Sequence, residues 1–580
     1  MVWRDLDATV GDVVIGLVHA DDGSGAVARL DASVLAGVHQ RLGEAMEEWG
    51  RIPSEEVIGH LLAGVDPLAA AARVTDVSRS LLRRHAPASA LSLLVAASHV
   101  AHPSVLFQFA HQAFAAAKIT GGFLDARALI ARAVVTNPAS ADLSRLEAAI
   151  ALTVGDLDAC AAALEEASAK VGPEQTDTRA ALAAIRAEFC YQRGSLDEAE
   201  AAAREAIALA REDDPLHTQA RNALTKVFMW RGDLDKSWDW TLENIARART
   251  RGATTEVLRG VINLGVIAVR RGSLDEATRQ FEAARAIAAR GGTMMLRGVL
   301  KENEAVVAHL RGRFGDALTL YQEALGILIR VGHRQFLARI ANNLGELYVQ
   351  IGETTRARRL CDYAAQVGRG LSRGVTAEGL LLRAQVELLD ARGDAARSAL
   401  TEALAMFTAA GEQTREAEAH LLLTRAALAD GELLQASQEI ATVPEDEPRL
   451  GIRIVAERAR LVAELSRAEG HESLPLARRA LDLAERAEDA DLRLRAHVQV
   501  GFAMLDRGDD VAARRHAESA ESLRVELVAR VPEALRVAYD ATIARTGLGQ
   551  LAARLDVMQS HGAARRRTSD IAPTAQLPDR

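Results

Sequence analysis

Asparagines at a regular spacing are the residues of this sequence best suited to holding a ligand. Asn263, Asn303 and Asn343 follow one another at intervals of 40 residues (303−263 and 343−303), and Asn222 precedes the first of them by 41 (263−222). A side-chain amide carries both donors and an acceptor, which match the N–H and C=O groups of a peptide backbone. The spacing therefore indicates a row of side chains that could bind an extended peptide. The alternative is that the same amides bond neighbouring elements of the protein itself.

Charged residues accompany the row of asparagines. Arg259 precedes Asn263 by four residues, and Arg339 precedes Asn343 by four. Residues four apart share one face of a helix. A guanidinium group matches the geometry of a carboxylate, so these pairs suit an acidic group on the ligand. Two further charged residues, each six before a glycine, are weaker candidates for the same surface: Lys226 and Glu346.

Tryptophan is concentrated in one short stretch. Trp230, Trp238 and Trp240 are three of the five tryptophans in the chain. Buried aromatic side chains often anchor a partner protein, so these residues could form an anchor pocket. Tryptophans that fill the space between packed helices are the commoner case, and we favour that interpretation.

Catalytic and metal-binding constellations are not predicted. The loop Asp21–Gly25 lacks the lysine of a phosphate-binding loop. His99, His102 and His111 lie close in sequence, but no carboxylate or thiol in the same stretch completes a metal site. Three cysteines are widely separated and fit small apolar positions in helices: Cys160, Cys190 and Cys361. We therefore expect a protein that is not an enzyme and that holds no cofactor or metal.

Glycines mark the elements that must position these side chains. Twelve glycines recur at intervals of 34 to 41 residues, each between two amphipathic helical segments. Self-similarity at such a period is typical of stacked-repeat proteins. The sequence thus predicts repeated helical hairpins. The predicted turn glycines are Gly121, Gly155, Gly194, Gly232, Gly272, Gly312, Gly352, Gly393, Gly431, Gly470, Gly508 and Gly547.

Small residues recur at fixed distances after these glycines. Five residues after the glycine, eleven of the twelve positions hold alanine, serine or cysteine, and Pro475 is the exception. Twelve residues after the glycine, eight of the twelve positions hold alanine. Only a small side chain fits where two helices cross closely, so this pattern predicts the contact line within each hairpin.

The central repeats resemble the tetratricopeptide repeat. The residues that carry the resemblance are Leu264, Gly265, Gly272, Ala277, Phe281 and Ala284 in one repeat, and Leu344, Gly345, Tyr348, Gly352, Ala357 and Ala364 in another. The period of about 39–40 residues exceeds the usual 34 of this family. The long period is similar to that of kinesin light chains, of bacterial peptide-pheromone receptors and of the sensor regions of some large bacterial transcription activators.

This resemblance implies the architecture. It implies an all-α fold, a right-handed superhelical solenoid of about 12 antiparallel helix pairs. In the family, the concave groove of such a solenoid binds extended peptides or partner helices. The resemblance therefore places the asparagines and arginines on the first helix of each repeat, facing the groove.

Bulk composition excludes several classes of function. The 580 residues carry a formal charge of −9 with a pI near 6.0, whereas a general nucleic-acid binder has a basic surface. No apolar stretch approaches the roughly 18 residues of a membrane span. The early acidic residues do not fit a secretory signal, and three unpaired cysteines fit a reducing compartment. We expect a cytoplasmic location.

Three regions are predicted along the chain. Residues 1–80 lack the repeat and are expected to form a helical cap or a small module. Residues 81–555 form the solenoid. Residues 556–580 contain glycine, serine, threonine and proline without apolar periodicity and are expected to be a disordered tail.

The leading functional hypothesis is a scaffold or adaptor that recognises another protein or peptide through the concave groove. One alternative is a signalling sensor, in which a peptide or small ligand alters the superhelix and thereby controls a partner transcription factor or ATPase. Another alternative is a structural protein that self-assembles. The sequence leaves the identity of the partner and the oligomeric state open.

Overall fold

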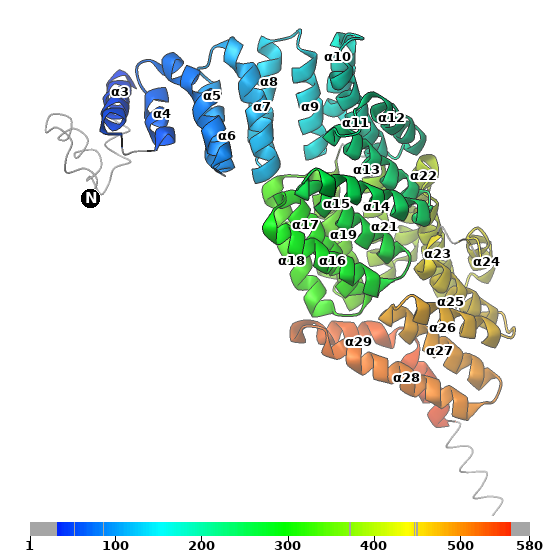
Figure 1. Ribbon diagram of the computed structural model, residues 1–580. Coiled ribbons are helices and arrows are strands. Elements are labelled where there is room, and N and C mark those ends of the chain that lie inside the picture. The colour runs from blue at the N-terminus through cyan, green and yellow to red at the C-terminus, as the bar shows by residue number, and fades with distance from the viewer. Residues whose placement is uncertain are drawn as a thin grey trace, which may run out of the picture.

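The structure is a computed structural model that describes residues 32–557, apart from residues 51, 52, 85, 370–372, 446, 448 and 449. Every element in these ranges is a helix, and successive helices pack as antiparallel hairpins along a curved path (Figure 1). The predicted all-α solenoid is confirmed. No helix in the described ranges combines the length and the apolar character needed to cross a membrane.

The first half of the solenoid comprises α3 (Ala32–Trp49), α4 (Ser54–Leu62), α5 (Pro67–Arg83), α6 (Pro87–Ser98), α7 (Pro103–Thr120), α8 (Phe123–Thr136), α9 (Ala141–Val154), α10 (Leu157–Lys170), α11 (Thr176–Arg193), α12 (Leu196–Leu209), α13 (Pro215–Trp230), α14 (Leu234–Thr250), α15 (Thr254–Arg270) and α16 (Leu274–Arg290).

The second half comprises α17 (Met294–Leu310), α18 (Phe314–Val331), α19 (Arg334–Ile351), α20 (Thr354–Gly368), α21 (Arg373–Leu389), α22 (Gly393–Ala410), α23 (Gln413–Asp430), α24 (Leu433–Ala441), α25 (Ile452–Ala468), α26 (Leu474–Arg486), α27 (Ala490–Asp506), α28 (Asp510–Ala529), the short 3₁₀ helix η3 (Glu533–Leu535) and α29 (Arg536–Ala544).

The predicted region boundaries fall as follows. The boundary after residue 80 lies inside α5, and α3 to α6 continue the same hairpin packing into α7. Residues 1–31, with the loop Asp21–Gly25, lie outside the described residues. So do residues 558–580 of the predicted tail.

Left-handed backbone conformations follow the first helix of each hairpin from α7 onward. Eleven of the twelve predicted turn glycines have φ between 68° and 90°, a region that side chains with a Cβ rarely adopt. The prediction for Gly393 is wrong, because the left-handed residue of that turn is Ala391, with φ of 56°, and Gly393 begins α22. The periodic small residue five positions on is therefore Ala396, which is fully buried, and not Ser398.

Replacing Ala391 by glycine should stabilise the folded protein. The left-handed conformation costs an alanine about 1 kcal/mol relative to glycine, so Ala391→Gly should raise the free energy of unfolding by about 0.5–1 kcal/mol. Gly431→Ala is the matched control, because it puts alanine into the same conformation in the next repeat, with no atom within 4 Å of the new Cβ. It should lower stability by a similar amount. Chemical denaturation measures both, and a loss of stability in Ala391→Gly would contradict the assigned turn.

Small residues lie where the two helices of a hairpin cross. Ala277, Ala317 and Ala357, each five residues after a turn glycine, are fully buried. Gly265 meets the second helix even more closely, because a Cβ built on it would lie 2.2 Å from Cε1 of Phe281. These contacts confirm the predicted contact line within the hairpins.

Ion pairs link consecutive repeats near their turns. In three repeats, the arginine immediately before the turn glycine pairs with an aspartate just after the turn glycine of the preceding repeat. Surface pairs of this kind each contribute at most about 1 kcal/mol, but they set the register of one hairpin on the next. The pairs are Arg231 with Asp197, Arg271 with Asp235, and Arg311 with Asp275.

The helices form two layers. The first helices of the hairpins, from α7 to α27 in odd numbers, pack on one another from repeat to repeat, for example α11 on α13, α17 on α19 and α23 on α25. The second helices, with even numbers, cover the other side of the hairpins. We call the odd-numbered helices the inner layer.

The solenoid curls until late repeats contact earlier ones. The backbone N–H of Gly315 donates to the carbonyl of Arg530 at 3.0 Å, and the Arg530 guanidinium donates to the carbonyl of Arg311 at 3.1 Å. Further along, the Arg545 guanidinium donates to the carbonyl of Leu389 at 2.7 Å. Figure 1 shows α28 and α29 beside α17 and α18 at this contact, which we call the inter-turn seam.

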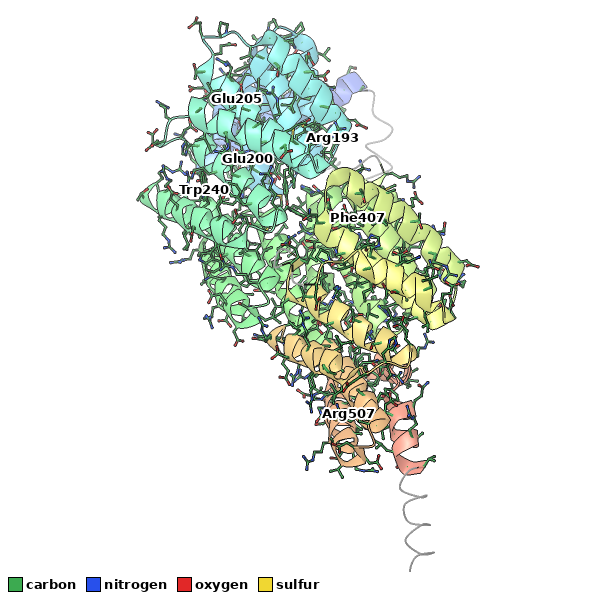
Figure 2. All side chains as sticks on the ribbon, turned by 90° about the vertical axis from the view of Figure 1, so that its right-hand side faces the viewer. Arg193, Glu200, Glu205, Trp240, Phe407 and Arg507 are labelled. Carbon is green, nitrogen blue, oxygen red and sulfur yellow. The ribbon has the colours of Figure 1, made fainter. Side chains whose placement is uncertain are left out.

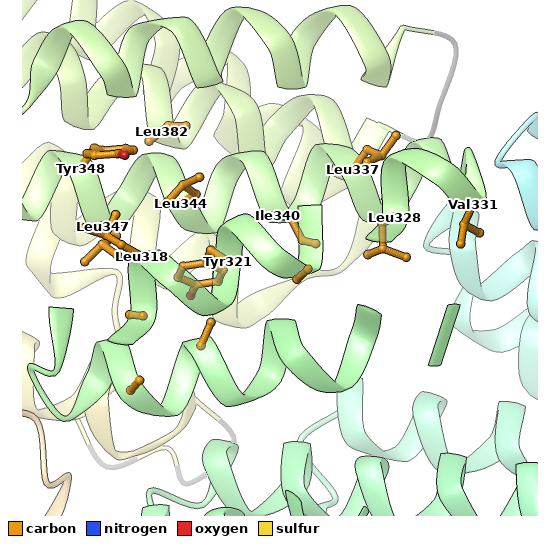
Figure 3. Close-up of a cluster of buried hydrophobic side chains, with 14 of the residues drawn as sticks. Leu318, Tyr321, Leu328, Val331, Leu337, Ile340, Leu344, Leu347, Tyr348 and Leu382 are labelled. Atoms are coloured by element: carbon orange, nitrogen blue, oxygen red, sulfur yellow. The ribbon is translucent and has the colours of Figure 1, made fainter. Parts of the chain in front are cut away.

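Apolar side chains also cross the inter-turn seam. The rings of Phe314 on α18 and Tyr539 on α29 meet edge to face with centroids 5.0 Å apart, and both residues are fully buried. One continuous hydrophobic cluster therefore includes residues from the first turn and from the last helices. Figure 3 shows its centre, where Tyr321 of α18 lies beside Ile340 and Leu344 of α19.

Candidate functional site

The inner layer presents charged side chains along one face. Neighbouring inner helices exchange ion pairs there: Lys226 with Glu188 at 2.7 Å between α13 and α11, and Arg415 with Glu378 at 2.9 Å between α23 and α21. We use the name inner face for the polar side chains of the inner helices that the argument concerns. They are Glu188, Lys226, Arg259, Asn263, Glu302, Arg339, Asn343, Glu346, Glu378, Arg415, Glu418, Arg425, Glu457, Arg460 and Arg495, of which Glu302 and Arg460 are buried.

Charges on the inner face act across the curl of the solenoid. Burial lowers the pKa of Arg270 on α15, and Arg415 on α23, four hairpins later, lowers that pKa further. Burial and then Glu188 raise the pKa of Tyr191 on α11 to about 12, and Arg339 on α19 opposes them. Charges on helices that are far apart in sequence therefore influence one another, α15 with α23 and α11 with α19.

Arg339 and Asn343 are held by an acid that the sequence did not single out. Glu302 on α17 is only 1% exposed. Its carboxylate accepts a bond of 2.7 Å from Nε of Arg339, a second bond from Nη2 of Arg339, and one of 3.2 Å from Nδ2 of Asn343. A buried carboxylate requires such a partner, so this predicted pair serves the packing of α17 against α19. The one feature of the sequence that could have indicated this contact is the position of Glu302 immediately before Asn303.

Arg259 and Asn263 on α15 are different, because neither has a side-chain partner. Within the described residues, Arg259 makes no hydrogen bond or ion pair, and Nδ2 of Asn263 is buried without an acceptor. The residues are one helical turn apart on the same face, as predicted. Lys118 on α7 is close enough to feel the charge of Arg259, because desolvation and then Arg259 and Arg145 lower its pKa, and Arg259 also acts to lower the pKa of Glu188 and of Glu256. This group of donors could hold an anion or a carbonyl oxygen.

The other two asparagines make contacts within the protein. Asn222 is 4% exposed, and its Oδ1 accepts from Nδ2 of Asn244 at 3.3 Å between α13 and α14. Nδ2 of Asn303 donates to the carbonyl of Val299 on its own helix at 2.7 Å, and its side-chain oxygen accepts no hydrogen bond from the described residues. The four asparagines therefore do not form one uniform row.

Of the two weaker candidates, Lys226 has a partner within the protein, whereas Glu346 has none among the described residues. Lys226 is paired with Glu188, and its Nζ lies 5.0 Å from the centre of the Tyr191 ring. Glu346 makes no hydrogen bond or ion pair in the part of the chain that the structure describes. Burial raises its pKa to about 7, against the opposing charge of Arg415. Burial therefore favours the protonated form of this carboxyl.

An apolar strip separates these two charged positions. Val266 on α15 and Val306 on α17 occupy the same place, six residues before the turn glycine, that Lys226 and Glu346 occupy in the flanking repeats. Both valines are partly buried against the hydrophobic clusters. The central part of the inner face can thus receive an apolar side chain between charged ones.

The three tryptophans do not meet in one pocket. The indole N–H of Trp230 donates to the Tyr191 hydroxyl, and Cζ of Arg270 lies 4.5 Å from the centre of the Trp230 ring. Trp230 also lines a cleft of about 590 Å³ beside the α22–α23 turn. Two others pack elsewhere. Trp238 joins the cluster of α15 and α16. The ring of Trp240, which is labelled in Figure 2, lies with its centroid 5.8 Å from that of Phe228. Only Trp230 is placed where a partner could reach it through this cleft.

The nucleophile and metal candidates have structural roles. Burial raises the pKa of Cys160 to about 12 and that of Cys190 to about 11, so both are protonated, unreactive thiols at neutral pH. Nδ1 of His102 caps α7 by accepting from the Ser104 N–H at 3.3 Å, and Nε2 of His111 lies 2.7 Å from Asp142. The described residues contain no group of three or more side chains placed to hold a metal ion.

Comparisons with known proteins concern the repeats. A family model described as tetratricopeptide repeat matches residues 297–360, which span α17 to α20. None of the curated protein sequences matches the chain. One similar solved structure is a Rap protein complexed with competence and sporulation factor: 12% identity, TM-score 0.46, covering 61% of this chain and 100% of that one. Another is the Cut9–Hcn1 hetero-tetramer of APC/C: 14% identity, TM-score 0.41, covering 88% and 98%.

Proposed function

We propose that this chain, a tetratricopeptide-repeat protein, is a scaffold that holds an extended segment of another protein along its inner face. One observation carries the proposal: among the described residues the Arg259 guanidinium has no hydrogen bond or ion pair, and the amide nitrogen of Asn263 is buried without an acceptor. A buried donor without an acceptor costs about 1–3 kcal/mol. A ligand that supplies the acceptor removes that cost.

The inner face defines what such a segment would contain. Asn263 donates to a backbone carbonyl of the segment, and Arg259, with Lys118 nearby, binds an acidic group on it. Val266 and Val306 contact an apolar side chain. Of the remaining candidates, Asn303, Asn343 and Glu346 keep an oxygen that can accept from the segment, while Asn222 is buried between α13 and α14 and contributes through packing.

The double variant Arg259→Gln, Asn263→Ala should weaken binding of the partner about 100-fold, because the bond to the charged Arg259 contributes about 1.5–3 kcal/mol and the neutral bond of Asn263 about 0.5–1.5 kcal/mol. The melting temperature should not fall, since neither side chain has a partner in the described structure. The partner is first captured from native lysate and identified by mass spectrometry, and its affinity is then measured by calorimetry.

Arg279→Gln is the matched control, because Arg279 lies on the outer helix α16 with its side chain 65% exposed. It should bind the partner like the unmodified protein. Unchanged affinity in the double variant would overturn the proposal. Equal loss of binding and of folded structure would assign Arg259 and Asn263 to packing.

A sensor is the second candidate, and the inter-turn seam favours it. Because late repeats touch earlier ones through Gly315 and Arg530, a ligand that widens the groove must separate this contact. Such a change would alter the surface offered to another chain, such as a transcription factor or an ATPase. Small-angle scattering with and without the captured partner segment distinguishes the candidates: a change in radius of gyration supports a sensor, and constancy supports a passive scaffold.

A further inference from the structure

The hairpin α13–α14 has a polar core. Six of its side chains that carry hydroxyl, amide or guanidinium groups are each no more than 6% exposed: Arg221, Asn222, Thr225, Ser237, Thr241 and Asn244. The first three belong to α13 and the others to α14. In the next hairpin, α15–α16, the buried residues are all apolar or glycine.

Hydrogen bonds cross from α13 to α14 through these side chains. Nε of Arg221 donates to Oδ1 of Asn244 at 2.7 Å, and Nη2 of the same arginine donates to the carboxylate of Glu243. Oγ of Ser237 donates to the carbonyl of Thr225 at 2.8 Å. The two helices are therefore held together by polar contacts.

Hydrophobic packing is interrupted at the same place. Leu224 and Phe228 of α13 belong to a cluster with α11 and α12, whereas Ile245 and Ala248 of α14 belong to a cluster with α15 to α17. From α14, the partly buried Trp240 packs against the first of these clusters. In the other hairpins that the structure describes, from α3–α4 to α27–α28, both helices contribute buried residues to one cluster.

Arginines also make the contacts on either side of this hairpin. Between the inner helices α13 and α15, Nη1 of Arg270 donates to the carbonyl of Met229 at 3.2 Å, and its Cζ lies over the ring of Trp230. At the end of α14, Nη2 of Arg251 donates to Oγ1 of Thr218 on α13 at 2.6 Å. Polar contacts thus join α13 to the helices that follow it.

Such an interface opens more easily than an apolar one. Apolar surface that becomes exposed to water costs about 25 cal/mol per Å². A hydrogen bond that is exchanged for bonds to water costs only about 0.5–1.5 kcal/mol net. Water that enters between α13 and α14 can satisfy each donor and acceptor, so this hairpin is the one we expect to open first.

We propose that the α13–α14 hairpin is a hinge, about which the N-terminal arm, defined as α3 to α13, moves against the rest of the solenoid. Figure 1 shows α3 to α10 extending away from the later repeats. Next to the hinge, the arm meets the later repeats across the cleft of about 590 Å³, which is lined by Ser195 of the α11–α12 turn and Thr414 of α23.

An apolar contact holds the arm in the closed position. At the α7–α8 turn, a Cβ on Gly121 would lie 3.2 Å from Cγ2 of Val331 at the end of α18, and Val331 is only 1% exposed. This contact, which we call the latch, must separate when the hinge opens. The movement changes the spacing between Lys226 on the arm and Arg259 beyond it. The hinge goes beyond the proposed function and does not rest on it, because it is a property of the chain without a partner.

Thiol labelling measures the opening of the hinge. Ser237 is 1% exposed and stands five residues after Gly232. Cys160 in α10 is 0% exposed and stands five residues after Gly155, so it is a natural control at the same position of another repeat. The full chain with Ser237→Cys is treated with a maleimide, and peptide mass spectrometry follows each thiol separately.

The thiol at position 237 should react at least about tenfold faster than Cys160, after each rate is divided by that of the same thiol in the denatured chain. Tenfold corresponds to an opening that costs about 1.4 kcal/mol less. Equal rates, or a faster reaction at Cys160, would overturn the hinge.

Low concentrations of urea distinguish a hinge from local unfolding. Urea accelerates an opening in proportion to the surface that the opening exposes. A hinge that keeps both helices folded exposes little surface, so the rate at position 237 should rise by no more than about twofold in about 1 M urea. A steep rise would show that the hairpin unfolds, and the proposal would be wrong.

Two variants of the Ser237→Cys chain test the cause of the opening. Val331→Ala weakens the latch, so labelling at position 237 should become about fivefold faster while that of Cys160 is unchanged. The triple variant Arg221→Met, Asn222→Ala, Asn244→Leu replaces the polar contacts by apolar ones and should slow the labelling toward the rate of Cys160. Unchanged labelling in Val331→Ala, or faster labelling in a triple variant of intact helicity, would contradict the hinge.

Discussion

Arg339→Met is expected to lower the free energy of unfolding by about 3–5 kcal/mol. The reason is Glu302, which is 1% exposed and depends on Arg339 for two of its hydrogen bonds. Removing the guanidinium leaves a buried carboxylate with only the amide of Asn343 to compensate it. Urea denaturation followed by circular dichroism measures the loss.

Two further variants isolate the cause of this effect. The double variant Glu302→Met, Arg339→Met should recover most of the lost stability, because replacing a buried pair by apolar residues is often neutral. Arg279→Met, which breaks an exposed pair with Glu276 on α16, should change stability by no more than about 1 kcal/mol. If Arg339→Met proves as mild as Arg279→Met, Glu302 is not buried in solution.

Gly352→Ala is expected to lower the free energy of unfolding by about 2–5 kcal/mol, as the sum of a left-handed alanine and an overpacked contact. Gly352 has φ of 90°, and a Cβ on it would lie 2.2 Å from Oγ1 of Thr542 and 2.8 Å from the carbonyl oxygen of Ala538. Both atoms belong to α29, on the far side of the inter-turn seam. The new methyl group must therefore push α29 away.

Gly431→Ala separates the seam from the turn itself. It imposes the same backbone conformation but meets no atom within 4 Å, so it should cost only about 1 kcal/mol. Hydrogen exchange should show faster exchange of the α29 amides in Gly352→Ala and unchanged exchange in Gly431→Ala. Equal effects of the two substitutions would mean that the seam does not form in solution.

The repeat register was predictable because its causes are local. A left-handed turn favours glycine, and a close helix crossing requires a small residue, so both leave marks at fixed spacing. The error at Gly393 follows from the same reasoning, since a glycine lies two residues after the left-handed Ala391. A strict period of 39–40 residues would have pointed to position 391.

The candidate site was predictable only in part. That Arg259 and Asn263 share a face follows from their spacing on one helix. That Glu302 binds Arg339 and Asn343 does not, because these contacts join residues 37 and 41 positions apart on different helices. The contact of Arg530 with Arg311 spans 219 positions and depends on the pitch of the whole superhelix, which no local pattern encodes.

Photo-cross-linking from the inner face tests most directly whether it holds another chain. A benzophenone amino acid replaces Val266 on the inner helix α15 or, as the reference, Leu242 on the outer helix α14, whose side chain is 46% exposed. Irradiation in native lysate should give a covalent adduct with a partner protein from position 266 and not from position 242. The adduct should disappear when Arg259→Gln is added. An adduct from position 242 alone, or one from position 266 that Arg259→Gln leaves unchanged, would contradict binding in the groove.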